Sequence, residues 1–267
     1  MPRMLLSAVE HVRPMKGGAQ SQLLRASDNR FYVVKFHNNP QHTRVLANEL
    51  LAARLARALG LPVPEPAIVD VPMALVGASP EMVIRQAGHS LRCAPGLQFG
   101  SRLPAAGAQQ PIYDYLPEAA LETVENLADF RGMLLFDKWT CNCNGRQVVF
   151  CRASRAAPLR VYMIDQGFCF NAGEWNFPDS PLRGVYSRNI VYRGVTGWPS
   201  FEPWLSRLEQ LDPEAVYQAA AEIPPTWYGR IEHLEGLLQE LLARRARVRD
   251  LVLAVKNCPR RPFENWP

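Results

Sequence analysis

Residues 136–170 constrain the fold more than any other stretch, because short apolar runs there alternate with polar and acidic side chains. The stretch reads FDKWTCNCNGRQVVF, then a loop, then RVYMIDQGFCF. We expect a helix to end near Trp139, a polar loop to follow, and two short strands over residues 148–151 and 161–164. The second strand delivers Asp165 just before Gly167, where a carboxylate can hold a metal ion in a cleft. The alternative is a surface hairpin whose Asp caps a turn, since Asx residues are common in turns.

Length and composition fit an ordinary globular protein. A chain of 267 residues allows one large domain or two small lobes that share a cleft. Its hydrophobic content of 48% and charged content of 21% argue against wholesale disorder. The net charge of +5 is mild. Part of the basic excess lies at Arg244, Arg245, Arg247 and Arg249. We interpret this cluster as the solvated face and dipole-favoured end of a helix, rather than as a surface for nucleic acid or anionic membrane.

Cysteine usage and hydropathy indicate the cellular compartment in which the protein is expected. No signal-peptide pattern opens the chain, so we expect a cytoplasmic protein whose cysteines are reduced. Cys141 and Cys143 form a C-x-C pair without a second pair or a His at ligand spacing, and zinc is therefore not favoured. No apolar run approaches 18 residues, so we predict no membrane span.

The first 85 residues predict a small α+β unit. A flexible turn over residues 16–21 precedes a hairpin over residues 22–25 and 31–36. Lys35 lies on the apolar face of the second run, which favours an anionic partner; the alternative is an edge lysine that extends into solvent. A helix is expected over residues 41–59. Its Glu49 lies near the apolar stripe and is the obvious partner for Lys35, unless it is solvated on the flank.

The remainder of the chain predicts mostly helix. Strands are expected over residues 66–71 and 82–84 with a turn at 77–80, and residues 86–115 predict few regular elements. Asn126 followed by Asp129 resembles a helix N-cap. Further helices are expected over residues 201–208, 213–221 and 227–255, the last with a core-facing leucine stripe. The predicted architecture is α+β, with an N-terminal lobe over residues 1–85 and a mainly helical C-terminal lobe over residues 86–267.

These features follow one another in an order that suits phosphoryl transfer. The chain lacks the phosphate-loop, dinucleotide-binding and nucleophile-elbow motifs. It does present a Gly-rich turn between strands, a strand lysine, a helix glutamate, a polar loop after a helix, and an Asp-x-Gly at a strand end. Phosphoryl transfer uses such a set, because N–H groups cover the phosphates, a lysine neutralises them, and an Asp and an Asn hold Mg²⁺.

The chain resembles the HipA-like kinase family, and more remotely the phosphoinositide 3-kinase-like fold. The resemblance is carried by the segments GGAQSQLL, FYVVKF, NELLAARLARALGLPVPEP, FDKWTCNCNGRQVVF and YMIDQGFCF, and it covers nearly the whole chain. It implies a two-lobed protein-kinase-like fold with a small β-rich N-lobe, one helix in that lobe, and a mainly helical C-lobe. It also implies that Lys35 contacts the nucleotide phosphates and that Glu49 pairs with Lys35. The further residues to which it assigns roles are Gly17, Gly18 and Ser21 over the phosphates, and Asp165 as the metal-binding aspartate.

The chain departs from the family pattern at the catalytic loop. The family's catalytic aspartate falls at Asn144, which cannot accept a proton as a carboxylate does. The metal-binding asparagine expected five residues later falls at Val149. Asn142 is a candidate replacement for this ligand. Asp137 and Asn142 also have the D-x₄-N spacing of a protein-kinase catalytic loop, so Asp137 is a candidate catalytic carboxylate.

The sequence thus predicts an atypical kinase that uses ATP and Mg²⁺. The expected acceptor is a Ser/Thr residue of a protein or a small molecule. The alternative is a pseudokinase that binds nucleotide or a protein partner, because Asn144 replaces the expected catalytic Asp. A nucleic-acid partner and a membrane partner are not expected.

Overall fold

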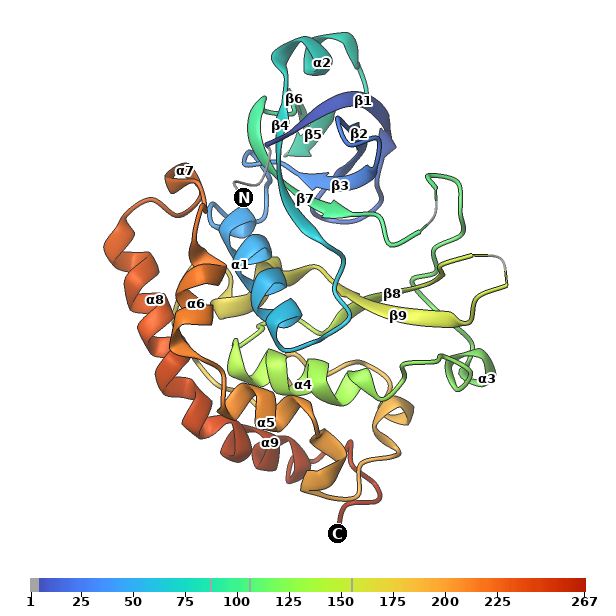
Figure 1. Ribbon diagram of the computed structural model, residues 1–267, viewed down its shortest axis with the longest axis vertical. Helices are drawn as coiled ribbons and strands as arrows, with labels where there is room; N and C mark the ends of the chain where they lie inside the picture. Colours follow the sequence, from blue (N-terminus) through green and yellow to red (C-terminus); the bar gives the residue numbers. More distant parts are fainter. Residues whose placement is uncertain (1–4, 87, 106, 155) are drawn as a thin grey trace.

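A closed five-stranded barrel forms one end of the computed structural model, which describes residues 5–86, 88–105, 107–154 and 156–267 (Figure 1). The strand order is β1–β2–β3–β7–β4, and parallel pairing of Leu6 with Val69 closes the barrel. Leu24, Val34 and Val71 are among the buried residues of its interior. The strands are β1 (Leu6–Pro14), β2 (Gln22–Ala26), β3 (Phe31–Lys35), β4 (Pro66–Val71) and β7 (Gly96–Arg102).

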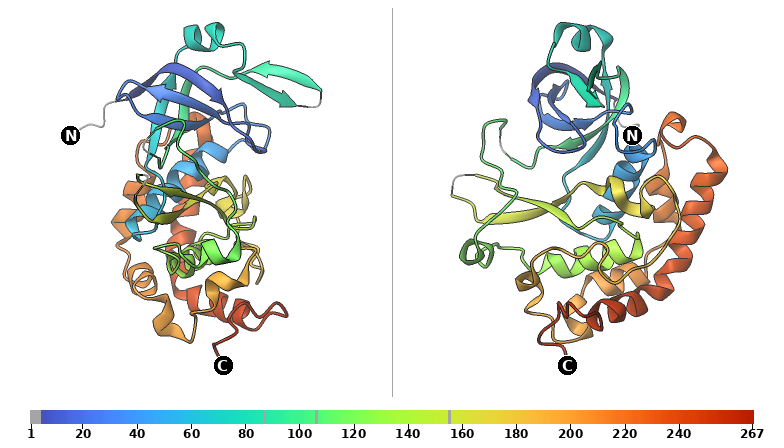
Figure 2. Two further views of the ribbon diagram at one scale, coloured as in Figure 1. Left: turned by 90° about the vertical axis from the view of Figure 1, so that its right-hand side faces the viewer. Right: turned by 180° about the vertical axis from the view of Figure 1, so that it is seen from behind.

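The barrel continues past the predicted lobe boundary at residue 85. Strand β7 pairs with both β3 and β4, so the expectation of few regular elements over residues 86–115 is wrong. Glycines at both 96 and 100 obscured this strand in the sequence, because Gly weakens a strand pattern. Positions 87 and 106 of that stretch lie outside the described residues. A hairpin of β5 (Val83–Gln86) and β6 (His89–Arg92) projects from the barrel (Figure 2). Helix α2 (Met73–Ala78) overlaps the predicted turn at 77–80.

Helix α1 (Val45–Ala58) lies beneath the barrel and packs against the rest of the chain (Figure 1). It begins four residues later than predicted. Before it the chain turns, and the N–H groups of Gln41 and Val45 donate to Asn39 Oδ1 and to the carbonyl of His42. The helix stops before Gly60, as predicted; the φ of this glycine is +76°, in the left-handed region that favours Gly.

Residues 136–170 form the end of a helix, a loop and a two-stranded hairpin. Helix α4 (Asp129–Trp139) ends at Trp139 as predicted, and β8 (Gln147–Arg152) pairs antiparallel with β9 (Leu159–Ile164). Asn126 does not cap α4; its Oδ1 instead accepts from the N–H of Val161, at 2.9 Å, and ties the helix start to β9. A short helix α3 (Glu118–Leu121) precedes it.

The C-terminal helices wrap around α4 (Figures 1 and 2). The predicted helix over residues 227–255 is broken into α7, α8, a 3₁₀ turn and α9. The elements are η1 (Gln166–Asn171), η2 (Asn189–Tyr192), η3 (Trp198–Phe201), α5 (Trp204–Glu209), α6 (Pro213–Ala220), α7 (Pro225–Tyr228), α8 (Ile231–Arg244), η4 (Arg245–Arg247) and α9 (Val248–Lys256). None of the helices within the described ranges has the length and apolarity to cross a membrane.

Arg244 corrects the interpretation of the basic cluster as a solvated helix face. Its side chain is buried, donates to the carbonyls of Lys138 and Trp139 at the end of α4, and forms an ion pair with Asp179. Arg249 pairs with Glu209 and remains partly exposed. The cluster therefore fastens the C-terminal helices to one another and to the end of α4.

Gly132 on α4 should be intolerant of a side chain. A Cβ there would lie 2.5 Å from ring atoms of Trp204 and 2.8 Å from Leu61 Cδ2. We expect Gly132→Ala to lower the free energy of unfolding by about 1–3 kcal/mol through overpacking, measured by urea denaturation. Gly236→Ala, on an open face of α8, is the matched control and should raise stability by up to about 1 kcal/mol. Equal effects of the two changes would contradict the packing described for α4.

Candidate functional site

A cavity of about 430 Å³ lies between the barrel, α1 and the β8–β9 hairpin. It gathers most of the residues that the sequence singled out, from positions far apart in the chain. Apolar side chains form much of its wall, and polar groups gather at the Gly-rich turn and at the end of β9. Its apolar lining includes Val33, Ala53, Val63, Phe99, Leu103, Ile112, Val149 and Met163.

Three charged side chains meet at the edge of this cavity. Lys35, the last residue of β3, donates from Nζ to Glu49 Oε1 and to Asp165 Oδ1. Glu49 comes from α1 and Asp165 from the end of β9. The ion pair that the sequence predicted between Lys35 and Glu49 is present. Side-chain exposure is 10% for Lys35, 3% for Glu49 and 18% for Asp165, so Asp165 is the carboxylate most open to a ligand.

Glu49 is fully engaged within the protein. Its Oε2 accepts from the N–H of Gln166 at 3.0 Å, and Oε1 accepts from the N–H of Gly167 at 2.8 Å. A Cβ at Gly167 would lie 2.7 Å from Val45 Cγ2, so a glycine is needed for α1 to approach this closely. The carboxylate thus joins the lysine strand, the helix and the loop after Asp165.

The charges stabilise one another against burial. Burial alone would lower the pKa of Lys35, but the carboxylates of Glu49 and Asp165 outweigh it and hold that pKa above its ordinary value. Burial raises the pKa of the Glu49 carboxyl group, and Lys35 together with the N–H of Gln166 opposes this rise. The arrangement keeps a cation at the cavity edge, where it can meet an anionic ligand.

Asn48 fastens η1, the segment that follows Asp165, to α1. Its buried Nδ2 lies 2.9 Å from the carbonyls of Gly167 and Cys169 and 2.7 Å from that of Ala172. Trp175 Nε1 donates to its Oδ1 at 2.7 Å. Sequence reasoning missed this role, although an Asn beside Glu49 on a buried helix face was a usable signal.

The Gly-rich turn covers the same cavity. Gly17, Gly18 and Ser21 all line it, and Gly17 has a φ of +119° that a residue with a side chain rarely adopts. This turn connects β1 to β2. Exposed backbone next to the Lys35 side chain is a suitable surface for phosphate oxygens.

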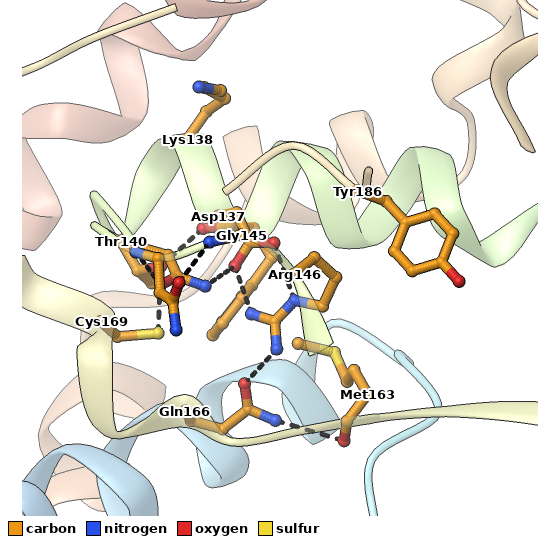
Figure 3. Close-up of polar contacts among 12 residues, drawn as sticks. Asp137, Lys138, Thr140, Gly145, Arg146, Met163, Gln166, Cys169 and Tyr186 are labelled. Carbon is orange, nitrogen blue, oxygen red and sulfur yellow. Dashed lines mark hydrogen bonds and ion pairs between the residues drawn. The ribbon is translucent and has the colours of Figure 1, made fainter. Parts of the chain in front are cut away.

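Asp137 and Asn142 do not line this cavity. Arg146 donates from Nε to Asp137 Oδ2 at 2.8 Å and from a second nitrogen to Oδ1, and both side chains of this ion pair are buried. Asn142 donates to Asp137 Oδ1 at 3.0 Å and accepts from the N–H of Asn144 at 3.1 Å. Arg146 also reaches Gln166 Oε1 at 2.7 Å (Figure 3). The geometry therefore argues against Asp137 as the catalytic carboxylate and Asn142 as the metal ligand.

Asn144 is exposed and lines the cavity, as does the apolar Val149. The carboxylates that line the cavity among the described residues are Glu49 and Asp165. Across the described ranges, no group of three or more His, Cys, Asp or Glu side chains could hold a metal ion. Of these two carboxylates, Asp165 is the one open to a ligand, because Glu49 is held by Lys35 and by the N–H groups of the loop after Asp165.

Removal of the Asp137 charge should lower the stability of the whole protein. Asp137→Asn would leave the Arg146 guanidinium buried without its counter-ion, and we expect a loss of about 3–5 kcal/mol in the free energy of unfolding, measured by urea denaturation. Glu125→Gln, which breaks the exposed pair with Arg160, is the control and should cost less than about 1 kcal/mol. Equal, small losses would show that Asp137 is free for another role.

His42 should make stability fall in mild acid. Burial lowers its pKa from the ordinary value of 6.5; Nε2 lies 2.8 Å from the carbonyl of Gly167, and the buried Nδ1 has no hydrogen-bond partner within the described structure. Because the unfolded chain binds this proton more readily, its contribution is present above pH 6.5 and is lost as the pH falls toward the folded pKa. His42→Gln should show a smaller loss of stability between pH 7 and pH 5. Parallel pH profiles for the two proteins would contradict this assignment.

Comparison with known proteins places this geometry in a family. A family model described as HipA-like kinase matches residues 9–149, more than half of the chain. No curated protein sequence matches. The solved structure of a Helicobacter pylori proinflammatory kinase, CtkA, is similar at a TM-score of 0.60 and 16% identity, over 93% of this chain and 96% of that one.

The Golgi casein kinase is also similar. Its TM-score is 0.55 at 14% identity, over 96% of this chain and 75% of that one. The same kinase with Mn and ADP bound gives a TM-score of 0.52 at 14% identity, over 94% and 74%. These likenesses show a kinase-like fold of mixed α and β structure. The family model, which matches more than half of the chain, shows that this chain belongs to the HipA-like kinase family.

Proposed function

We propose that this chain binds ATP in the cavity beneath the barrel and transfers the γ-phosphate slowly to a Ser/Thr side chain of a protein or to a small-molecule hydroxyl group. The observation that carries the proposal is the cluster of Lys35, Glu49 and Asp165 at the edge of a cavity covered by a Gly-rich turn. Family membership supports the same conclusion.

The cavity suits the parts of a nucleotide. Its apolar wall, with Val33, Ala53 and Phe99, would take the base, and Gly17 and Gly18 would cover the phosphates. Lys35 would neutralise the phosphate charge, and Glu49 would keep Lys35 oriented. Ser21, the last residue of the same turn, also lines the cavity.

Asp165 is the residue that would hold a divalent cation, Mg²⁺ or Mn²⁺. The fit is reasonable, because Mg²⁺ at nucleotide sites is bound by one or two carboxylates together with phosphate oxygens. When bound, the cation neutralises negative charge on the phosphates. The Golgi casein kinase structure contains Mn and ADP, which supports this cofactor choice.

We also propose that the chain is two-lobed, with the cavity between the lobes. The barrel and α1 would form the nucleotide lobe, and the helices from α4 onward would form the second. Because β7 belongs to the barrel, we would draw the boundary between the lobes near residue 102 rather than at the predicted residue 85.

A pure binding role is the second candidate, and Asn144 favours it. No carboxylate other than Glu49 and Asp165 lines the cavity among the described residues, so a general base is lacking. Positioning and charge neutralisation still support phosphoryl transfer, but absence of a base lowers the rate by roughly 10²–10⁴-fold. The chain would then be a nucleotide-binding pseudokinase.

Nucleotide should stabilise the protein through Lys35. We expect ADP with Mn²⁺ at 100 times its dissociation constant to raise the free energy of unfolding by about 2.7 kcal/mol, seen as a thermal shift. Lys35→Met should remove most of this shift at the same ligand concentration. No shift in the wild type would overturn both the kinase and the nucleotide-binding proposals.

Transfer of labelled phosphate separates the two candidates. If the chain is a slow kinase, Asn144→Asp should raise its rate of transfer by up to roughly 10²–10⁴-fold, since it restores a carboxylate at the exposed position in the cavity. Asp137→Glu serves as the contrast and should not raise the rate, because that position is buried. If the wild type and Asn144→Asp both bind nucleotide but neither transfers phosphate, the result would support the pseudokinase.

A further inference from the structure

Gln41 lies in the cavity beneath the Gly-rich turn. It belongs to the loop between β3 and α1, and its side chain lines the cavity together with Lys35 and Asp165. A Cβ built at Gly18 would lie 3.7 Å from Gln41 Nε2. The carboxamide is thus in contact range of the turn that would cover the nucleotide phosphates.

The position of Gln41 is fixed by a buried neighbour. Its N–H donates to Asn39 Oδ1 at 2.8 Å, and Asn39 Nδ2 donates to the carbonyl of Ala19 in the Gly-rich turn, also at 2.8 Å. Asn39 is only 8% exposed. Asn39 therefore joins the Gly-rich turn to the backbone of the loop that carries Gln41.

Gln41 Oε1 is buried and has no hydrogen-bond partner within the described structure. A buried oxygen of this kind is uncommon, because most buried polar atoms are paired. Nearby side-chain oxygens are already used: both oxygens of Glu49 accept hydrogen bonds, and Gln166 Oε1 accepts from Arg146. Among the described side-chain oxygens of this cavity, Gln41 Oε1 is the buried one that lacks a donor.

We propose that Gln41 Oε1 is a neutral ligand to the divalent cation whose charged ligand is Asp165. This proposal rests on the proposed function, and it names a ligand that the family resemblance did not assign. An amide oxygen is a hard ligand of the type that Mg²⁺ and Mn²⁺ accept. The apolar Val149 cannot supply one, and Asn142 is committed to Asp137. The cation would satisfy the unpaired oxygen, which is an acceptor and cannot bond to the phosphate oxygens.

The test is the gain in ADP affinity that Mn²⁺ produces, measured by isothermal titration with and without the metal. Even loss of an outer-shell partner costs roughly 10–100-fold in metal affinity. We therefore expect Gln41→Met to lower the Mn²⁺-dependent gain by roughly tenfold or more and to leave metal-free ADP affinity nearly unchanged. Gln41→Glu, which keeps the oxygen and adds charge, should retain or enlarge the gain.

Gln20→Met is the matched control. Gln20 lies in the same turn, but its carboxamide is already bonded at both ends to the backbone of Arg85. The Gln20→Met change should leave the ratio of the ADP affinities with and without Mn²⁺ unchanged. An unchanged ratio in Gln41→Met would overturn the proposal, as would an equal loss with and without metal, which would mark Gln41 as a phosphate contact. If the wild type binds no ADP under either condition, the proposed function fails instead.

Discussion

A buried lysine that must keep its charge controls the arrangement of this protein. Lys35 is held between Glu49 and Asp165, and the three side chains come from a barrel strand, a helix and the end of a hairpin. A buried charge is costly unless it is paired, so these elements must meet where they do. The close contact of α1 with Gly167 and the bonds from Asn48 to η1 maintain the meeting point. The three charged side chains form part of the lining of the cavity.

A second buried ion pair joins Asp137, in α4, to Arg146, in the polar loop that follows this helix. The guanidinium also reaches the carbonyl of Ile164 and Gln166 Oε1, on either side of Asp165. The ion pair of Asp137 and Arg146 therefore holds the residues before and after Asp165 in place. The loop presents the neutral Asn144 to the cavity, whereas the Asp137 carboxylate, in α4, is held in the buried ion pair. Under the proposed function, this site would bind a phosphate-bearing ligand but would transfer phosphate slowly.

The sequence predicted the parts of the site that local patterns expose. Lys35 in an apolar strand and Glu49 near an apolar helix face both required a partner, and an Asp before a Gly at a strand end indicated a ligand position. Other features depended on contacts that no local pattern shows. Asp137 looked available from its spacing to Asn142, but Arg146, nine residues on, folds back to cover it. Strand β7 was hidden by its glycines, and Gln41 was predicted as the first residue of a helix, whereas it lies in the loop before α1. Arg244 looked like a solvated helix end because its partners lie more than 60 residues away.

Hydrogen exchange of the intact protein tests the central claim most directly, since it reports where a nucleotide contacts the chain. If the cluster at Lys35 forms the nucleotide site, ADP with Mn²⁺ should slow exchange in the Gly-rich turn over residues 16–21 and in residues 163–168, with little change in α8 and α9. Protection confined to the C-terminal helices, or no protection at saturating nucleotide, would contradict the account.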